Sequence, residues 1–338
     1  MAKFYYGGQA MMEGVMMRGK RSAAVAIRTP GGAISVYEEG LSPRLYQNPI
    51  FRLPFVRGIL LLWEMLVLGT RLMTLSANVA TGALVLSDSS SMPEANDAGL
   101  AGTNGTGERT EEEKPPVLGG AMLIVTLVIS LLFAVGVFFV GPLFLSNLLR
   151  NQIGTGWLNI VVEGVIRLAL LLVYLYLIGL IPDIQRVFGY HGAEHKAINA
   201  MESGDPVDVE HVRKASRQHT RCGTGFLLLV MVVSIFVFAL VGSPSLPLKI
   251  LSRIVLVPVV AGVAYELMRL GAANYRFRVV RWLLAPGLAL QGLTTREPDD
   301  SMIECAIAAL QRVTQRDEVE GVAFERVAEP LPPLVVAK

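Results

Sequence analysis

Residues 115–149, PPVLGGAMLIVTLVISLLFAVGVFFVGPLFLSNLL, form a run of 35 residues without Asp, Glu, Lys or Arg. A second run, 222–248, has 27 such residues. Each is longer than the ~20 residues that a helix needs to cross the hydrocarbon core of a bilayer. The sequence therefore predicts a mainly α, polytopic helical membrane protein. A purely soluble globular protein, a fibrous repeat and a disulfide-rich secreted scaffold are excluded.

The overall composition agrees with this class. The chain is 52% hydrophobic and 17% charged, whereas an average soluble protein is about 25% charged. The net charge of +2 argues against nucleic acid as a partner. Only two cysteines occur, Cys222 and Cys305, which favours reduced thiols in a cytoplasm-facing protein. The first residues lack a basic segment followed by an apolar one, so no cleaved signal is expected.

Four spanning helices are expected, at about 119–146, 158–181, 224–242 and 252–270. The loop 182–223 between the second and third spans holds six basic residues, namely Arg186, Lys196, Arg213, Lys214, Arg217 and Arg221. The positive-inside rule places this loop and both termini in the cytoplasm. An even number of spans requires the termini to share a side, so the count and the charges agree. The lipid bilayer is the partner that these features predict.

Segment 54–80 admits two interpretations. It is long and apolar enough to span, but Arg57, Glu64 and Arg71 recur every seven residues and fall on one helix face. An amphipathic helix lying on the membrane fits this stripe, and we favour it. The alternative is a fifth span with its polar stripe facing the bundle interior.

The remaining segments complete a modular organisation. A β-hairpin is expected around Thr29-Pro30-Gly31-Gly32, because β-prone runs flank this turn sequence. Ser301-Met-Ile-Glu304 matches a capping box that opens a short apolar helix. The expected modules are an N-terminal cytoplasmic module with the hairpin and interfacial helix (1–87), a linker of disordered composition (88–116), a membrane bundle with the histidine-rich loop 182–223 (117–290), and a C-terminal cytoplasmic helix with a loose tail (291–338).

All four histidines lie within 29 residues of the second loop, at positions 191, 195, 211 and 219. His191-Gly-Ala-Glu194-His195 has the form H-x-x-E-H. On a helix the two histidines are about 40° apart and one turn removed, so both imidazoles can reach one ion. Glu194 lies on the neighbouring flank, where it can act as general base towards a water activated by the ion. The pattern predicts a divalent metal site, with zinc as the favoured ion.

The third ligand is left open by the spacing. His219 ranks first, followed by Glu266 in the fourth span and Cys222 at the entry to the third. Glu202 shares a face with His191 but lies about 10 Å further along the helix than His195, so an indirect role is expected. His211 lies in a charged, surface-like run and is expected to be exposed.

Glu163 and Arg167 lie inside the second span at i,i+4. Ionisable groups at that depth indicate function or a bundle-facing pair. A helix-internal ion pair is the simpler interpretation.

Six motifs, taken together, resemble the YqhQ-like family of bacterial membrane proteins, sometimes labelled predicted metal-dependent enzymes. The motifs are Gly7-Gly-Gln-Ala10, Met12-Glu-Gly-Val-Met-Met-Arg-Gly19, His191-Gly-Ala-Glu-His-Lys196, Arg221-Cys-Gly-Thr224, Tyr265-Glu-Leu267 and Leu293-Thr-Thr-Arg-Glu-Pro298. The resemblance covers nearly the whole chain except 88–116 and the tail. It implies location in the bacterial inner membrane and supplies no reaction.

The resemblance also marks residues 7–19, GGQAMMEGVMMRG, as a signature. Its glycines permit close backbone approach, and Gln9, Glu13 and Arg18 supply an amide, a carboxylate and a cation. We favour a plain structural turn before the hairpin; the alternative is a loop whose polar residues cap a site, bind an anionic group or contact substrate.

Two functions follow from these patterns. The first is a membrane-embedded metal-dependent hydrolase acting at the cytoplasmic face on a membrane-associated substrate. His191 and His195 would bind the ion, one of the three candidates would complete the shell, and Glu194 would be the catalytic base. The second is a non-enzymatic scaffold or transporter-like protein with a structural ion or none.

Overall fold

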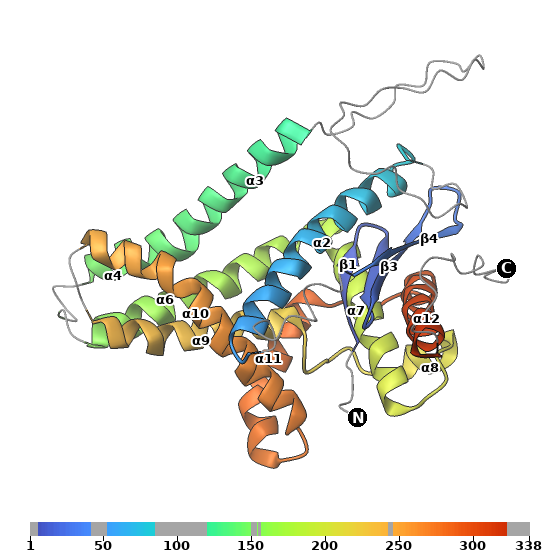
Figure 1. Cartoon of the computed structure of the whole chain (residues 1–338). Coiled ribbons are helices and arrows are strands. Elements are labelled where there is room, and N and C mark those ends of the chain that lie inside the picture. Colours follow the sequence, from blue (N-terminus) through green and yellow to red (C-terminus); the bar gives the residue numbers. More distant parts are fainter. Residues whose placement is uncertain are drawn as a thin grey trace.

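The computed structural model of the chain describes residues 6–41, 53–84, 120–149, 154, 157–242 and 246–322. The expected linker 88–116 and the expected loose tail from 323 lie outside the described residues. The fold is mainly helical with one antiparallel sheet (Figure 1).

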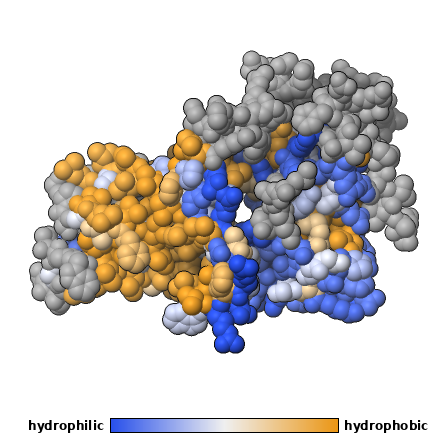
Figure 2. Space-filling model, turned by 60° about the horizontal axis from the view of Figure 1, so that its bottom comes forward, coloured by the Kyte–Doolittle hydropathy of each residue, from blue (hydrophilic) through white to orange (hydrophobic). Residues whose placement is uncertain are grey.

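Apolar helices make up the bundle. Five helices in the described residues are long and apolar enough to cross a membrane. Four of them match the expected spans and the fifth is α2 (Val56–Ala80). The bundle elements are α3 (Gly120–Val135), the π-helix η2 (Gly136–Val140), α4 (Gly141–Leu148), α6 (Trp157–Ile178), α9 (Gly223–Val241) and α10 (Leu246–Ala273). Figure 2 shows apolar side chains gathered over the bundle and hydrophilic ones over the other part of the molecule.

A four-stranded sheet has the order β1-β2-β3-β4, with every neighbouring pair antiparallel. The strands are β1 (Gly7–Met11), β2 (Gly14–Arg18), β3 (Ser22–Arg28) and β4 (Ile34–Gly40). The hairpin expected around Thr29–Gly32 is confirmed, because that turn joins β3 to β4.

Residues 7–19 form a second hairpin, so the expectation of a plain turn or a loop there is wrong. Met11 and Met16 are buried on one face of the sheet, whereas Val15 and Met17 are buried on the other. Because both faces are covered, apolar residues are not confined to alternate positions. The period of two that normally marks a strand is therefore hidden in this sequence.

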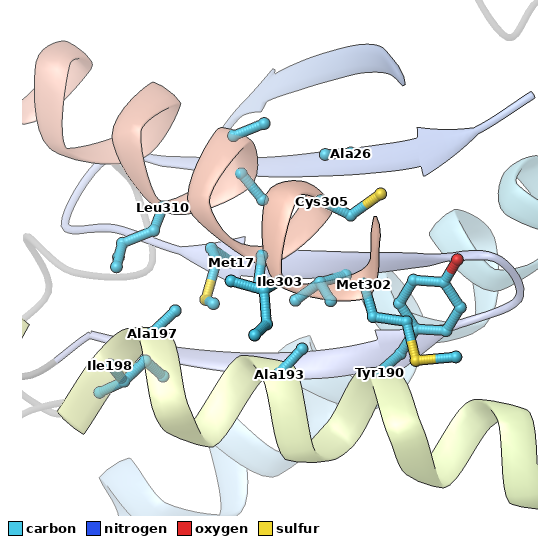
Figure 3. Packing of buried hydrophobic residues seen from close by; sticks show 14 of the residues in the cluster. Met17, Ala26, Tyr190, Ala193, Ala197, Ile198, Met302, Ile303, Cys305 and Leu310 are labelled. Carbon is cyan, nitrogen blue, oxygen red and sulfur yellow. The ribbon is translucent and has the colours of Figure 1, made fainter. Parts of the chain in front are cut away.

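Helices cover both faces of the sheet. One face packs on α2 through Leu68, Leu72 and Val79. The other packs on α7 (Pro182–Ser203) and α12 (Asp300–Val322). Figure 3 shows side chains of α7, α12 and the strands meeting in this second core, with Met17 between the helices. The alanine-rich strand β3 allows the helices on both faces to lie close to the sheet.

The histidine-rich loop 182–223 is largely helical. It contains α7, which begins at Pro182 and is followed by Gly204 in the left-handed conformation, and the short α8 (Val209–Lys214). Pro in the first turn and Gly after the last turn are the usual boundaries of a helix.

The cap of α12 differs from the expected capping box. Asp299, rather than Ser301, accepts a hydrogen bond from the Met302 amide, at 2.9 Å. Glu304 pairs with Arg28 at 2.8 Å instead of returning to the helix start. An aspartate just before the helix supplies a carboxylate cap, which frees Glu304 for the sheet.

The polar stripe of α2 is confirmed, and it faces the protein. Arg57 pairs with Glu266 of α10, Glu64 pairs with Arg18 of β2, and Arg71 pairs with Glu39 of β4. On the opposite side, Trp63 is 66% exposed and Leu66 is 63% exposed. The polar stripe of α2 therefore docks on the protein together with Leu68, Leu72 and Val79, and the apolar side with Trp63 and Leu66 points outward.

The i,i+4 pair in α6 is also present. Arg167 donates to Glu163 at 2.9 Å, to the Ser234 hydroxyl at 3.2 Å and to the Phe138 carbonyl of η2 at 3.0 Å. Both charged side chains are buried. The pair faces the bundle interior, where it joins α6 to η2 and α9.

Candidate metal centre

Three donor atoms from two helices converge at one point. His191 and His195 lie on consecutive turns of α7, and Cys222 is the N-cap residue of α9. The Cys222 Sγ lies 3.3 Å from His191 Nε2. One ligand atom from each of the three residues lies within 4.8 Å of the others. This is the one such group of histidine, cysteine or acidic residues in the described part of the chain.

Backbone carbonyls orient both imidazoles. His191 Nδ1 lies 2.8 Å from the Thr294 carbonyl oxygen, and His195 Nδ1 contacts the Arg217 carbonyl oxygen. A carbonyl only accepts hydrogen bonds, so each Nδ1 carries the proton and each Nε2 presents its lone pair. Metal-binding histidines are commonly held in this way by a partner of the second ring nitrogen.

Gly192 explains how the Thr294 carbonyl reaches α7. A Cβ at position 192 would lie only 2.1 Å from the Arg296 carbonyl oxygen. The Arg296 amide donates to the Phe188 carbonyl at 2.9 Å. The segment after α11 (Arg278–Thr294) therefore runs directly along α7, and only glycine leaves it room.

Cys222 is held at the start of α9. Its sulfur accepts a hydrogen bond from the Thr224 amide at 3.4 Å. The Thr224 hydroxyl is 2.9 Å from the Thr294 hydroxyl, which links this helix start to the carbonyl that orients His191. The N-terminal end of a helix stabilises negative charge, and a metal-bound thiolate carries one.

His219, ranked first as the third ligand, lies beside this group rather than in it. Its ring centroid is 5.5 Å from that of His195. Its Nε2 lies 3.1 Å from an Arg221 nitrogen and 3.9 Å from a Glu202 oxygen. Burial lowers the pKa of His219. The three-atom group contains Cys222, which ranked third.

Glu202 and Glu266 have other partners. Glu202 pairs with Arg221 and lies near His219, consistent with an indirect role. Glu266 accepts hydrogen bonds from Arg57 and from the Phe55 amide. Glu266 thus holds α2 against α10, and Glu266 is not a member of the histidine group.

Glu194 is buried between α7 and β1. A Cβ at Gly8 would lie 2.9 Å from Glu194 Cγ, so glycine is required for this contact. Burial raises the pKa of Glu194 to about 7, while the neighbouring His191 and the hydrogen bond from the Gly8 amide oppose the rise. The carboxyl can therefore hold or release a proton near neutral pH.

Polar residues of the signature 7–19 tie the sheet to its helices. Glu13 pairs with Arg186 of α7 and accepts from the Tyr190 hydroxyl at 3.1 Å. Arg18 pairs with Glu64 at 3.0 Å. The Gln9 amide lies against Gly69 of α2. In the described contacts, Gly8 is the part of this signature that reaches the H-x-x-E-H motif.

Sequence reasoning missed several supporting residues. The Gln291 amide accepts from the His219 amide at 2.9 Å and donates to the His219 carbonyl at 2.8 Å. Glu297 pairs with the buried Lys196 at 2.6 Å and with Arg217 at 3.0 Å. The motif 293–298 marks the segment that contains Thr294 and Glu297. However, no local pattern in the sequence indicates which residues they contact.

Comparisons with known proteins assign the chain to a protein family. The family model described as "Protein of unknown function (DUF1385)" matches residues 53–316. The chain belongs to the DUF1385 family. It is also 36% identical over 312 residues to "Uncharacterized protein YqhQ" of Bacillus subtilis (strain 168), covering 91% of this chain and 92% of that protein. The resemblance that the motifs indicated is confirmed. The part that matches the DUF1385 model includes all three donor residues. No solved structure matches the chain.

Proposed function

We propose that this chain is a membrane-bound, metal-dependent hydrolase whose site lies at the cytoplasmic face. The observation that carries the proposal is the convergence of His191, His195 and Cys222, whose ligand atoms lie within 4.8 Å of one another, with Cys222 Sγ 3.3 Å from His191 Nε2. In addition, a backbone carbonyl accepts from Nδ1 of each imidazole. Three residues that met by chance would not be expected to have both rings held in this way.

The donor set suits a divalent ion, and zinc best. Two neutral imidazoles and one thiolate are preferred zinc ligands, and three protein ligands are typical of a catalytic site. Zinc held there would supply Lewis acidity and lower the pKa of a coordinated water towards ~7.

Glu194 is the residue for proton transfer. It precedes His195 in the chain, and its pKa of about 7 suits a group that accepts and returns a proton near neutral pH. The Gly8 amide fixes its carboxyl from the side of β1. His191 and His195 would bind the ion, and Glu194 would take a proton from the attacking water.

Packing and charge support the proposed position of the site. β1 and β2, α7, and α12 share one core, so the N-terminal sheet, the histidines and the C-terminal helix lie on one side of the bundle. The basic residues of loop 182–223 favour the cytoplasm of a bacterial inner membrane for that side, by the positive-inside rule. The substrate would then reach the site from the cytoplasm or from the bilayer.

Metal analysis of the detergent-purified protein tests the proposal. About one zinc per chain is expected for wild type, and none for His191→Ala/His195→Ala. His211→Ala is the matched control, because His211 is an exposed histidine of α8 paired with Asp208. No metal in wild type after incubation with zinc would refute the proposal, as would equal loss in the control.

A second function is favoured by the burial of His219 next to His195. A rotation of that ring would bring a fourth ligand and close the shell, as in a structural zinc site of a scaffold or transporter-like protein. X-ray absorption of the zinc-loaded protein separates the two functions. A zinc shell of two imidazole nitrogens, one sulfur and one water oxygen supports the hydrolase. A shell of three imidazole nitrogens and one sulfur supports the structural site.

A further inference from the structure

Three arginines gather at the turn between α10 and α11 without an acidic partner. Arg276, Arg278 and Arg281 are exposed, and they form no ion pair with the part of the chain that the structure describes. By contrast, exposed arginines of α2, α7 and α8 pair with glutamate or aspartate. Residues 267–296 contain no Asp or Glu. This end of the molecule therefore has a positive charge that no nearby acidic residue balances.

Large apolar side chains flank these arginines. Val279 is 69% exposed, Trp282 is 78% exposed and Leu283 is 65% exposed. Helical residues three apart lie on one side of a helix, so Val279 and Trp282 form an apolar band beside the basic one. A Cβ at Gly271 would lie 3.1 Å from Leu284 Cδ1, which shows that α11 packs closely on the end of α10. Figure 1 shows this helical hairpin projecting from the bundle.

The surface of a membrane with anionic phospholipids fits this combination. Basic residues beside an exposed apolar face are typical of helices in the headgroup layer, where cations contact phosphates and apolar side chains enter the acyl region. An acidic soluble partner would account for the arginines but not for the exposed Trp282. The candidate span Val255–Ala273 ends directly before the arginines. The hairpin is therefore placed where lipid headgroups begin.

The C-terminal part of the same helix holds the candidate metal centre. Gln291 accepts from the His219 amide at 2.9 Å and donates to the His219 carbonyl at 2.8 Å. The Thr294 carbonyl orients His191, and the Thr294 hydroxyl contacts that of Thr224 at the start of α9. One helix thus connects the exposed arginines with the residues that support the metal centre.

Pro286 lies between these two parts of α11. Proline has no amide to donate to the carbonyl four residues earlier, so a helix bends more easily there. The bend decides whether the exposed face of the first part can lie on a membrane while Gln291 and Thr294 keep their contacts. A surface that binds the described arrangement best also favours the geometry of the metal centre.

We propose that the α10–α11 hairpin binds the headgroups of anionic phospholipids through Arg276, Arg278 and Arg281. Lipid bound there stabilises the arrangement of α11 that supports the metal centre, and so it raises the affinity for zinc. The lipid site rests on the charge and exposure of the hairpin alone. Its effect on zinc rests on the proposed function as well.

Tryptophan quenching by brominated lipids tests the lipid site. The full-length protein with Trp63→Phe/Trp157→Phe keeps Trp282 as its one tryptophan. It is placed in phosphatidylcholine nanodiscs with a minor fraction of brominated phosphatidylglycerol or brominated phosphatidylcholine. The binding constant for phosphatidylglycerol relative to phosphatidylcholine should be about fivefold or more. Arg278→Gln/Arg281→Gln should abolish this preference.

Two further variants control for charge and folding. Arg213→Gln/Lys214→Gln removes two positive charges from α8, where both residues have acidic partners, and should keep the preference. Arg278→Lys/Arg281→Lys retains the charge and should keep most of it. No preference in the parent protein, an unchanged preference in Arg278→Gln/Arg281→Gln, or equal loss in the α8 variant would overturn the lipid site. So would removal of the preference by inorganic phosphate, because the site would then take a soluble anion.

Chelator competition in the same nanodiscs tests the effect on zinc. Phosphatidylglycerol should raise the zinc affinity of wild type by about fivefold. Arg278→Gln/Arg281→Gln should lose this increase, which excludes simple attraction of zinc to the anionic surface. Gln291→Ala should keep the lipid preference of Trp282 and lose the increase. Lipid preference with a zinc affinity that does not depend on lipid would overturn the effect on zinc alone. Lipid preference without any zinc binding would refute the hydrolase and leave the lipid site intact.

Discussion

The two cysteines of the chain have opposite surroundings. Cys222 faces His191 at the start of α9. Cys305 lies in the core between the sheet, α7 and α12, where burial raises the pKa of its thiol to about 11. The first is placed to bind an ion, and the second behaves as a small apolar residue.

A serine at each cysteine separates these roles. We expect Cys222→Ser to lose most bound zinc, because a hydroxyl is a poor replacement for a thiolate. Cys305→Ser should retain zinc, although its melting temperature should fall. Titration with a zinc-competing chelator measures the zinc affinity of both variants. Equal zinc affinity in wild type and Cys222→Ser would show that the sulfur is not a ligand.

The sequence predicted the His191/His195 pair because residues four apart on a helix are neighbours whatever the tertiary structure. Cys222 could not be ranked correctly in this way. Its position depends on how α9 docks against α7 and on the Thr224–Thr294 contact. Those contacts join residues far apart in the chain, and spacing carries no information about them.

Glu13 gives a pH-dependent prediction. Its hydrogen bond with Arg186 lowers the pKa of the Glu13 carboxyl below the ordinary 4.5, against an opposing effect of burial. A lowered pKa contributes stability that is present above pH 4.5 and is lost as the pH falls through the folded-state value. Since Arg186 is 49% exposed, solvent screening reduces the contribution to about 1 kcal/mol at pH 7.

Glu13→Gln should therefore lower the melting temperature at pH 7 by about 2–4 °C. The difference from wild type should narrow as the pH is lowered below 4.5. Thermal unfolding in detergent at a series of pH values measures this difference in melting temperature. Glu210→Gln is the control, since Glu210 forms only an exposed pair with Lys214 within α8. A difference that is constant with pH would rule out the ionic contribution.

At the scale of elements, the contacts of α2 bear on whether it crosses the membrane. Its first turn is joined to α10 by Arg57 and Glu266. Its last turns pack on the sheet through Val79, and Ser76 donates to the Met12 carbonyl. Because the sheet also packs on α7, the C-terminal end of α2 contacts parts of the protein on the side of the histidines.

We expect α2 to lie along the membrane surface with Trp63 and Leu66 towards lipid. Single cysteines are introduced at Gly31 in the β3–β4 turn, at Thr81 after α2 and at Leu149 after α4. A membrane-impermeant maleimide should label Leu149→Cys in intact cells. Gly31→Cys and Thr81→Cys should react only after permeabilisation. The native cysteines are buried and should give little background. Labelling of Thr81→Cys in intact cells would establish α2 as a fifth span.

Some elements were accessible from sequence and others were not. Long apolar runs predicted the spans because a bilayer imposes length and composition on a helix. The β3–β4 hairpin was marked by its turn residues. β1 and β2 were hidden because α2 covers one face of the sheet while α7 and α12 cover the other. The pairing of Glu266 with Arg57 likewise depends on how α2 docks on α10.

At the scale of the whole molecule, segments expected as separate modules share one core. Residues from β1 to β3, from α7 and α8, and from α12 all contribute to it. Ion pairs cross the same boundaries, with Arg312 of α12 joined to Glu38 of β4 at 2.6 Å. The N-terminal sheet is thus an integral layer between α2 and the helices that carry the site.

This shared core predicts that the chain can be cut between α2 and α3 without loss of the fold. Fragments 1–87 and 117–338, expressed together, should copurify through a tag on the second fragment and bind zinc. All three donors lie on 117–338, yet that fragment alone should bind little zinc, because α7 and α12 would expose the apolar faces that the sheet covers. Met17→Asp in the first fragment is the control: Met17 is fully buried, and an unpaired charge in that core opposes assembly by several kcal/mol. If fragment 1–87 accumulates without copurifying, or if 117–338 binds zinc equally well alone, the sheet is a separate domain and does not support the site.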